Sequence, residues 1–341
     1  MTDGTSPPVP SETLQMHQLL SGFITSQVLY VAAELGIPDE LAGGPRTVAE
    51  LAAATGADAD ALRRLIRYLA SFGVFRTDGD SVHLTDLGKT LTSGTPGSLR
   101  DFARYWMKTH YSPFSELLQT ARTGETAATH YFGKPFFEWV GESGELSQLQ
   151  NTAMVEGAAP ARGALIDTYQ LPAGRVVADI GGADGSLLTG LLLRHPDRAG
   201  IVFDLPAVVA GASTTIEAAG LSDRVRAVGG DFFGSVPEAD VYLLSTVLHD
   251  WSDAEAGEIL RNVAKSARPG ARLVIVEMVL PEGDAPDFAK LVDVVMLGLL
   301  GGRERTRAEW TRLLADAGFT LDRVVPGPAA FSIVEATRSA S

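Results

Sequence analysis

The sequence has no cysteine among its 341 residues. Disulfide bonds, thiolate nucleophiles and cysteine-based metal sites are therefore excluded. Basic side chains are also scarce, because 28 Lys and Arg stand against 42 Asp and Glu, for a formal net charge of −14. A protein that binds nucleic acid usually presents a basic face. The charge balance therefore argues against a nucleic-acid partner.

Long apolar runs are missing as well. None reaches the roughly 18 residues that indicate a membrane-spanning helix. The first residues, MTDGTSPPVPSE, are polar and rich in proline, whereas a secretory signal peptide has a basic region followed by an apolar one. The six histidines are scattered and form no metal-ligand pattern. We therefore expect a soluble, cytoplasmic protein with no membrane partner and no metal site.

The chain changes character at about residues 160–172. Helical patterns dominate before this point, and short apolar strands alternate with helices after it. A chain of 341 residues, 45% of them hydrophobic, is long enough for two domains with cores of their own. We predict a mainly helical domain over residues 1–165 and an α/β domain over residues 166–341.

The N-terminal domain has the pattern of a winged helix. Residues 47–75 read as helix, turn and helix, with Gly56 closing the first helix. Asp78 and Gly79, which follow, form a hairpin turn signal.

Two features of this domain bear on its partners. Arg63, Arg64 and Arg67 lie on the helix that would read DNA in a transcriptional regulator, although the acidic balance favours a structural role for it. The helix expected over residues 12–35 is apolar around much of its circumference. Such a helix needs a partner surface, in the same chain or in a second subunit.

The C-terminal domain alternates strands and helices. A strand pair expected around Gly327 brings the predicted strands to seven. The other five strands are expected within residues 175–182, 199–206, 223–233, 239–250 and 271–280. This alternation predicts a Rossmann-like, mostly parallel sheet. Ligands bind such sheets outside the carboxyl ends of the strands.

Every one of these five strand ends carries an acid or a histidine. The first strand runs into the glycine turn GGADG at residues 181–185, where the backbone can approach a nucleotide-like ligand closely. This turn lacks the G-x-G-x-x-G fingerprint of dinucleotide-binding proteins. Asp204, at the end of the second strand, suits hydrogen bonding to ribose hydroxyls. The remaining strands end in Asp231, His249 and Glu277.

His249 has the position and chemistry of a general base. The SDAE capping box that begins at Ser252 starts a helix, so His249 lies on the turn before it. An imidazole, with an unperturbed pKa of about 6.5, can take a proton from a substrate hydroxyl. A carboxylate must orient it, and Glu277 and Glu304, the latter in GGRERT, are the candidates.

The motifs GGADG, FDLP, GDFF, VLHDWSD, VEMVLPEG and GGRERT occur in this order along the chain. Together they closely resemble those of S-adenosylmethionine-dependent small-molecule O-methyltransferases, the plant caffeate-type family and its bacterial natural-product relatives. The resemblance covers nearly the whole chain. It implies a methyltransferase sheet, a winged-helix-like N-terminal domain that forms a homodimer, and an aromatic or polyketide-like small molecule as acceptor.

Carried over residue by residue, the resemblance implies that His249 is the base and that Glu277 and Glu304 flank it. The cofactor contacts that it implies are Gly181, Asp204, Asp231, Phe232 and Ser245. Plant relatives often have lysine where this chain has Ser245, which has less reach.

The acceptor pocket implied by the resemblance includes Met154 and Met296, although methionines are also ordinary core residues. The expected reaction is methyl transfer to a hydroxyl that His249 deprotonates. One alternative is a relative that keeps the cofactor but catalyses hydroxylation or decarboxylation. Another is a winged-helix DNA-binding regulator.

Overall fold

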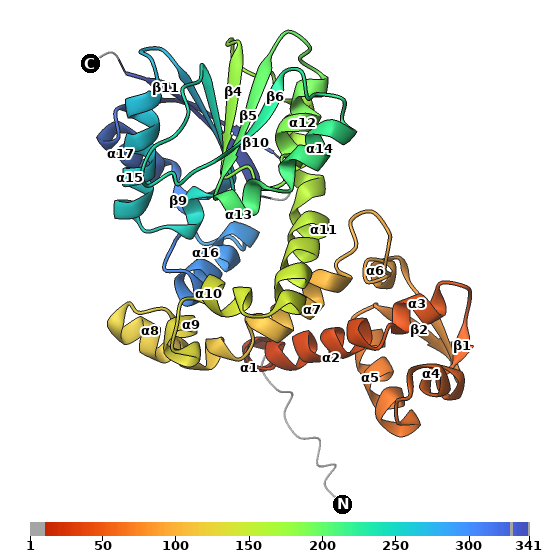
Figure 1. Ribbon diagram of the computed structural model, residues 1–341. Helices are drawn as coiled ribbons and strands as arrows, with labels where there is room; N and C mark the ends of the chain where they lie inside the picture. Colours follow the sequence, from red (N-terminus) through yellow and green to blue (C-terminus); the bar gives the residue numbers. More distant parts are fainter. Residues whose placement is uncertain (1–10, 328–329, 340–341) are drawn as a thin grey trace, which may run out of the picture. The chain divides into compact units, whose positions relative to one another are not determined.

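The computed structural model describes residues 11–327 and 330–339, with the backbone alone at residues 155–160. Contacts divide the chain into two compact units, Met1–Ser112 with Val140–Ala158 and Pro113–Trp139 with Ala159–Ser341. Helix α10 (Phe136–Gly141) and the long helix α11 (Gly144–Thr168) each run from one unit into the other (Figure 1). The expected boundary after residue 165 stays a prediction. Contacts group residues 113–139 with the second unit.

The first unit is mainly helical and carries a small antiparallel sheet. Its strands are β1 (Arg46–Thr47), β2 (Phe75–Asp78) and β3 (Ser81–Leu84), in the order β1-β3-β2. Its helices are α1 (Ser11–Leu20), α2 (Gly22–Glu34), α3 (Ile37–Leu41), α4 (Val48–Thr55), α5 (Ala59–Ser71), α6 (Asp86–Lys89) and α7 (Arg100–Thr109). This is the winged-helix-like arrangement that the sequence predicts.

Local sequence explains these elements. Gly56 ends α4 with a left-handed φ of 70°, and the turn between β2 and β3 includes Gly79. The single helix predicted over residues 12–35 is instead two, because Ser21 interrupts it. The Ser21 hydroxyl donates hydrogen bonds to the preceding turn, and a Ser-Gly pair such as Ser21 and Gly22 is a common place for a helix to kink.

The second unit is built on one mixed sheet in the order β10-β11-β8-β7-β4-β5-β6, with β9 paired to β8 outside this path. The strands from β8 to β6 are parallel, and β11 is antiparallel to both of its neighbours. The strands are β4 (Val176–Ile180), β5 (Ala199–Asp204), β6 (Val225–Gly229), β7 (Val241–Ser245), β8 (Arg272–Leu280), β9 (Arg305–Thr306), β10 (Phe319–Pro326) and β11 (Phe331–Arg338). The predicted mostly parallel sheet, with its closing strand pair, is confirmed.

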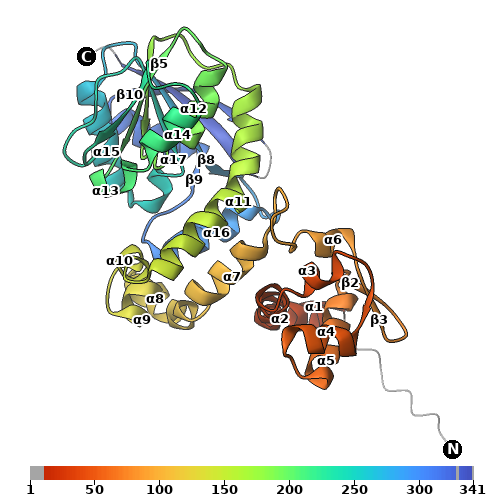
Figure 2. The same ribbon diagram turned by 45° about the vertical axis from the view of Figure 1, so that its right-hand side comes forward.

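Helices cover both faces of this sheet (Figure 1). On one face lie α12 (Ser186–Leu193) and α14 (Ala212–Ala218), side by side in Figure 2. On the other lie α15 (Asp253–Ser266) and α17 (Arg307–Asp316), whose apolar sides complete the core. The remaining helical elements are η1 (Pro113–Glu116), α8 (Leu117–Thr123), α9 (Ala127–Phe132), α13 (Pro206–Val209), η2 (Leu248–Asp250) and α16 (Phe288–Leu299). Within the described ranges, no helix has both the length and the apolarity to span a membrane.

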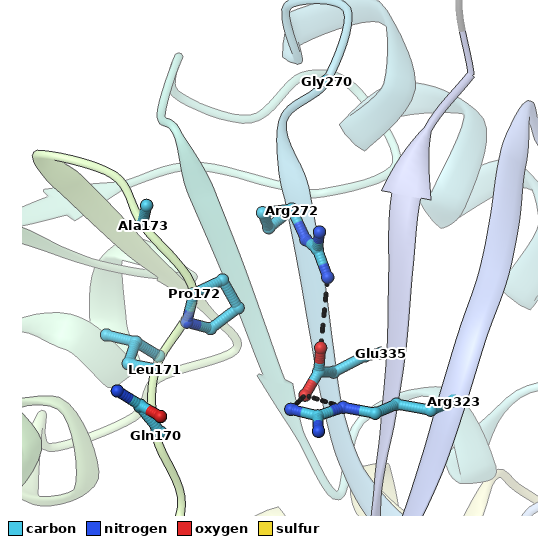
Figure 3. A pocket seen from close by; sticks show the side chains of 8 residues that line it. All are labelled: Gln170, Leu171, Pro172, Ala173, Gly270, Arg272, Arg323 and Glu335. Atoms are coloured by element: carbon cyan, nitrogen blue, oxygen red, sulfur yellow. Dashed lines mark hydrogen bonds and ion pairs between the residues drawn. The ribbon is translucent and has the colours of Figure 1, made fainter.

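One pocket lies at the amino ends of the strands (Figure 3). Its charged side chains pair with one another, because Glu335 accepts hydrogen bonds from Arg272 at 3.1 Å and from Arg323 at 2.6 and 2.9 Å. These charges have a structural role in joining β8, β10 and β11. The candidate site lies at the opposite ends of the strands.

Candidate active site

The register of the parallel strands brings their carboxyl ends to one edge. Ile180 pairs with Phe203, and Ser245 pairs with Val276. Gly181 follows β4 and Asp204 ends β5, while Glu277 follows the Val276 that pairs with the last residue of β7, so the three lie along the same edge of the sheet. This alignment is a consequence of the parallel topology.

His249 lies on η2, directly after the end of β7. Its Nδ1 is 2.7 Å from Oε1 of Glu304, whose side chain is buried, and its own side chain is only 14% exposed. A carboxylate can only accept a hydrogen bond, so Nδ1 carries the hydrogen and donates. Nε2 is left for a second partner, and Oδ1 of Asp250 lies 3.4 Å from it.

The charges around His249 favour its protonated form. Burial alone would lower the pKa of His249, but the charge of Asp250, the hydrogen bond that Nδ1 donates to Glu304 and the charges of Glu304 and Glu277 outweigh it and raise the pKa to about 10. Burial in turn raises the pKa of Asp250 to about 6 and that of Glu277 to about 7. The imidazole and the carboxylates therefore form one cluster that shares protons.

Glu277 and Glu304 act on different parts of the histidine. Oε1 of Glu277 accepts hydrogen bonds from the backbone N–H groups of Val247, Leu248 and His249, at 3.2, 2.7 and 3.2 Å. It therefore fixes the backbone of the turn. Of the two candidate carboxylates, Glu304 is the one that contacts the imidazole ring.

The segment of residues 301–305 packs directly against this turn. The backbone N–H of Arg303 donates to the carbonyl of His249 at 2.8 Å, and a Cβ at Gly302 would collide with that same carbonyl. Asp293 on α16 accepts from the N–H of Glu304 at 2.9 Å. The position of Glu304 is thus fixed through its own backbone and through its neighbours.

The glycine turn after β4 shapes the neighbouring part of the edge. Gly181 has a left-handed φ of 76°, and a Cβ there would meet Val247 at 2.7 Å. Oδ2 of Asp204 accepts from the N–H of Ala183, in this turn, at 2.9 Å. The turn therefore holds Asp204, the predicted ribose contact, at its place on the edge.

Asp231 and Phe232 lie on the loop after β6. Asp231 accepts a hydrogen bond from the N–H of Phe233 at 2.9 Å, and the Phe232 ring meets the Trp251 ring edge to face at 6.0 Å. The side-chain amide of Asn262 donates to the carbonyl of Phe232 at 3.0 Å. Phe232 is therefore held by the side chains of Trp251 and Asn262, and Asp231 by a hydrogen bond within its own loop.

Arg162, on α11, was not predicted as a site residue, because it belongs to none of the sequence motifs. Its Nη1 donates to Oγ of Ser245 at 3.4 Å and to Oγ1 of Thr246 at 3.1 Å. Its buried Nε has no hydrogen-bond partner among the described residues. A guanidinium thus reaches Ser245, one of the predicted cofactor contacts.

Asp179, near the end of β4, is a second residue to which the sequence alone gave no role of its own. It is buried, and its Oδ2 lacks a hydrogen-bond partner within the described part of the chain. Burial raises the pKa of Asp179 to about 7, against the lowering effect of Arg162. Asp179 thus has a buried acceptor and Arg162 a buried donor, each without a partner among the described residues. This pair suits a ligand group that carries both an ammonium and a carboxylate.

Met296 is buried on α16, and Met154 is 38% exposed on α11. The two methionines belong to different units. Their shared role in an acceptor pocket stays a prediction.

Two family descriptions match this chain. One, the O-methyltransferase domain, matches residues 114–320, and the other, the O-methyltransferase dimerisation domain, matches residues 17–94. The chain is 42% identical to phenazine O-methyltransferase PhzM of Lysobacter antibioticus over 94% of each protein. It is 39% identical to O-demethylpuromycin-O-methyltransferase of Streptomyces alboniger, over 93% of this chain and 87% of that protein.

Solved structures agree with these matches. A crystal structure of LaPhzM has a TM-score of 0.87 and 41% identity, covering 97% of this chain and all of that one. CalO1, a methyltransferase in calicheamicin biosynthesis solved in its SAH-bound form, has a TM-score of 0.87 and 33% identity, covering 98% of this chain and all of that one. The chain belongs to the O-methyltransferase family and is an enzyme that uses S-adenosylmethionine.

Proposed function

We propose that this enzyme methylates a hydroxyl of an aromatic or polyketide-like natural product, with His249 as the general base. The observation that carries the proposal is the contact of 2.7 Å between Nδ1 of His249 and Glu304, which makes Nε2 the ring nitrogen that would accept the proton. The relatives named above, which act on a phenazine and on O-demethylpuromycin, favour this substrate class.

The reaction moves a proton from the acceptor hydroxyl to a base and a methyl group from the cofactor's sulfur to the acceptor oxygen. Bound S-adenosylmethionine supplies an electrophilic methyl group on a sulfonium. Nε2 of His249 takes the proton of the acceptor hydroxyl, whose oxygen forms the new bond to carbon while the carbon–sulfur bond breaks and its electrons stay on sulfur. Glu304 stabilises the imidazolium that results, because its carboxylate accepts from Nδ1. A well-placed base of this kind contributes roughly 10²–10⁴-fold.

The residues at the carboxyl edge fit the cofactor. We assign the carboxylate of its methionine part to the Arg162 guanidinium and its ammonium to Asp179, because each residue has a buried atom with no partner in the described chain. Asp204 suits the ribose hydroxyls, and Asp231 with Phe232 suits the adenine. Ser245 accepts a hydrogen bond from Arg162, and we expect it to lie next to the same part of the cofactor.

The experiment is a mass-spectrometric screen with S-adenosylmethionine and a panel of phenols, naphthols and polyketides. The expected product is heavier than its acceptor by one CH₂, and His249→Ala abolishes it while cofactor affinity stays unchanged. Undiminished turnover in His249→Ala would remove this residue from the mechanism. A product that gains oxygen, or loses carbon dioxide, would favour the hydroxylation or decarboxylation alternative. A DNA fragment retarded at physiological salt would revive the regulator alternative.

A further inference from the structure

Arg305 is the most deeply buried cation near the site. It is fully buried at the start of β9, and its guanidinium lies over the Trp310 ring at 5.3 Å. Burial of a charged group is costly unless the group is paired and hydrogen-bonded. The groups that accept hydrogen bonds from Arg305 therefore indicate its role.

The Arg305 guanidinium binds both sides of the histidine turn. Nη1 donates to the carbonyl of Leu248 and Nη2 to the carbonyl of Trp251, each at 2.9 Å. Nε donates to Oδ1 of Asp253, at the start of α15, also at 2.9 Å. Leu248 precedes His249 and Trp251 follows it by two residues, so one planar group holds the backbone on either side of the base.

Arg305 is also the residue after Glu304. Glu304 binds the imidazole ring of His249, while Arg305 binds the backbone carbonyls before and after His249. A shift of the turn relative to residues 301–305 would therefore change the distance from His249 to Glu304. A misplacement of about 1 Å can cost roughly 100-fold in rate.

We propose that Arg305 is a positioning residue for the methyl transfer, which holds the His249 turn at hydrogen-bonding distance from Glu304. This inference rests on the proposed role of His249 as the base. Arginine is suited to this role because its donors diverge in a fixed plane, whereas lysine has one nitrogen and cannot bind two carbonyls and a carboxylate spread along that plane.

The test compares Arg305→Ala and Arg305→Lys with Arg268→Gln. Arg268 is the control, because it also pairs with a carboxylate, Glu238, but its side chain is 75% exposed and neither residue belongs to the His249 turn or to residues 301–305. We expect kcat to fall about 100-fold in both Arg305 variants and to stay near native in Arg268→Gln. The KM for S-adenosylmethionine should not move, and millimolar guanidinium should restore part of kcat in Arg305→Ala.

A readout that needs no turnover is the titration of His249, followed by NMR of its ring Cε1–H and assigned by its loss in His249→Gln. The charged groups that face the ring are Asp250, Glu304 and Glu277, and Arg305 adds a positive charge beyond them. Loss of that charge alone would raise the pKa of His249. Separation of His249 from Glu304 would lower it, so the sign of the shift distinguishes the two effects.

We expect the pKa of His249 to fall by about one unit or more in both Arg305 variants. A pKa that stays or rises, together with native kcat in a folded Arg305→Lys, overturns the proposal. If Arg305→Ala fails to fold, Arg305→Lys is judged by the same two measurements. If His249→Ala keeps full turnover while the Arg305 variants still lower the His249 pKa, the proposed base is wrong and the positioning contact stands.

Discussion

At the scale of single residues, the chemistry depends on which atoms are left without partners. His249 has one ring nitrogen bound to Glu304, and the other lies 3.4 Å from Oδ1 of Asp250. Arg162 and Asp179 have buried polar atoms that no described residue satisfies. Such atoms are costly in a folded protein, so they mark the places where a bound molecule would contribute most.

Replacement of Glu304 by Gln removes a charge but keeps the shape of the side chain. The imidazolium loses its best partner, so the pKa of His249 should fall towards 6.5 and kcat should fall by about 100-fold. Steady-state kinetics and NMR titration measure the two effects. Isothermal titration calorimetry with S-adenosylmethionine is the control, and a large loss of cofactor affinity would contradict the assigned role.

Replacement of Arg162 by Ala tests the cofactor side. Hydrogen bonds to charged groups contribute roughly 1.5–3 kcal/mol, so the Kd for S-adenosylmethionine should rise by about 10- to 100-fold. Calorimetry measures this directly. Binding of 5′-methylthioadenosine, which lacks the amino acid part, should be unaffected; equal losses for both ligands would show that Arg162 does not bind the carboxylate.

At the scale of elements, much of the site could be predicted from the sequence because it depends on local signals. The capping box that begins at Ser252 forms as expected, and a second capping box forms at Thr306. These boxes fix where α15 and α17 begin, which places His249 and Glu304 on the turns before them. The alternation of strands and helices then predicts a parallel sheet, in which the carboxyl ends of the strands lie along one edge.

The rest of the site depends on tertiary contacts that leave no pattern in the chain. Arg162 lies on α11, remote in sequence from the Thr246 that it contacts. Glu277 binds backbone N–H groups, and no spacing in the sequence distinguishes this from a contact with the ring. The break of the first helix at Ser21 was missed because helical periodicity continues across it.

Gly302 offers a test at this scale. A Cβ there would collide with the carbonyl of His249, so Gly302→Ala should displace the turn and lower kcat by at least about tenfold. Gly190→Ala is the control, because Gly190 lies within α12 with open space around its Cβ position and alanine favours a helix. Equal activity of the two variants would show that the segment adjusts without cost.

At the scale of the whole molecule, pH should act through the cluster around His249. The pKa of His249 is raised from 6.5 to about 10, so the neutral base becomes more abundant as pH rises. We expect kcat/KM to increase from pH 7 towards pH 10 in a pH–rate profile, with a shallower increase in Glu304→Gln. A profile that levels off near pH 6.5 would contradict the raised value.

The same shift has the opposite effect on stability. A group whose pKa is higher in the folded than in the unfolded chain stabilises the fold most below its unfolded pKa. This contribution of His249 is therefore complete below about pH 6.5 and is lost as the pH rises through about 10. Urea denaturation of native and His249→Gln protein across this window should show the difference shrinking.

The dimerisation domain predicts a homodimer. Helix α1 buries none of its residues in a single chain, and Leu19, Leu20 and Phe23 are 68%, 68% and 55% exposed. Exposed apolar surface of this kind marks an interface. Leu20→Asp combined with Phe23→Asp should convert dimers to monomers in light scattering, while an unchanged mass would place the interface elsewhere.

The segment of residues 301–305 has a consequence for the engineering of this enzyme. The same turn, the one that carries His249, is contacted by four consecutive residues: Gly302, the backbone of Arg303 and the side chains of Glu304 and Arg305. Several of the parts that position the base are thus encoded in one short stretch of the gene. Libraries that vary the chain elsewhere can search for new acceptors without disturbing it, whereas a chimera that divides this stretch from its turn should lose catalysis however well it folds.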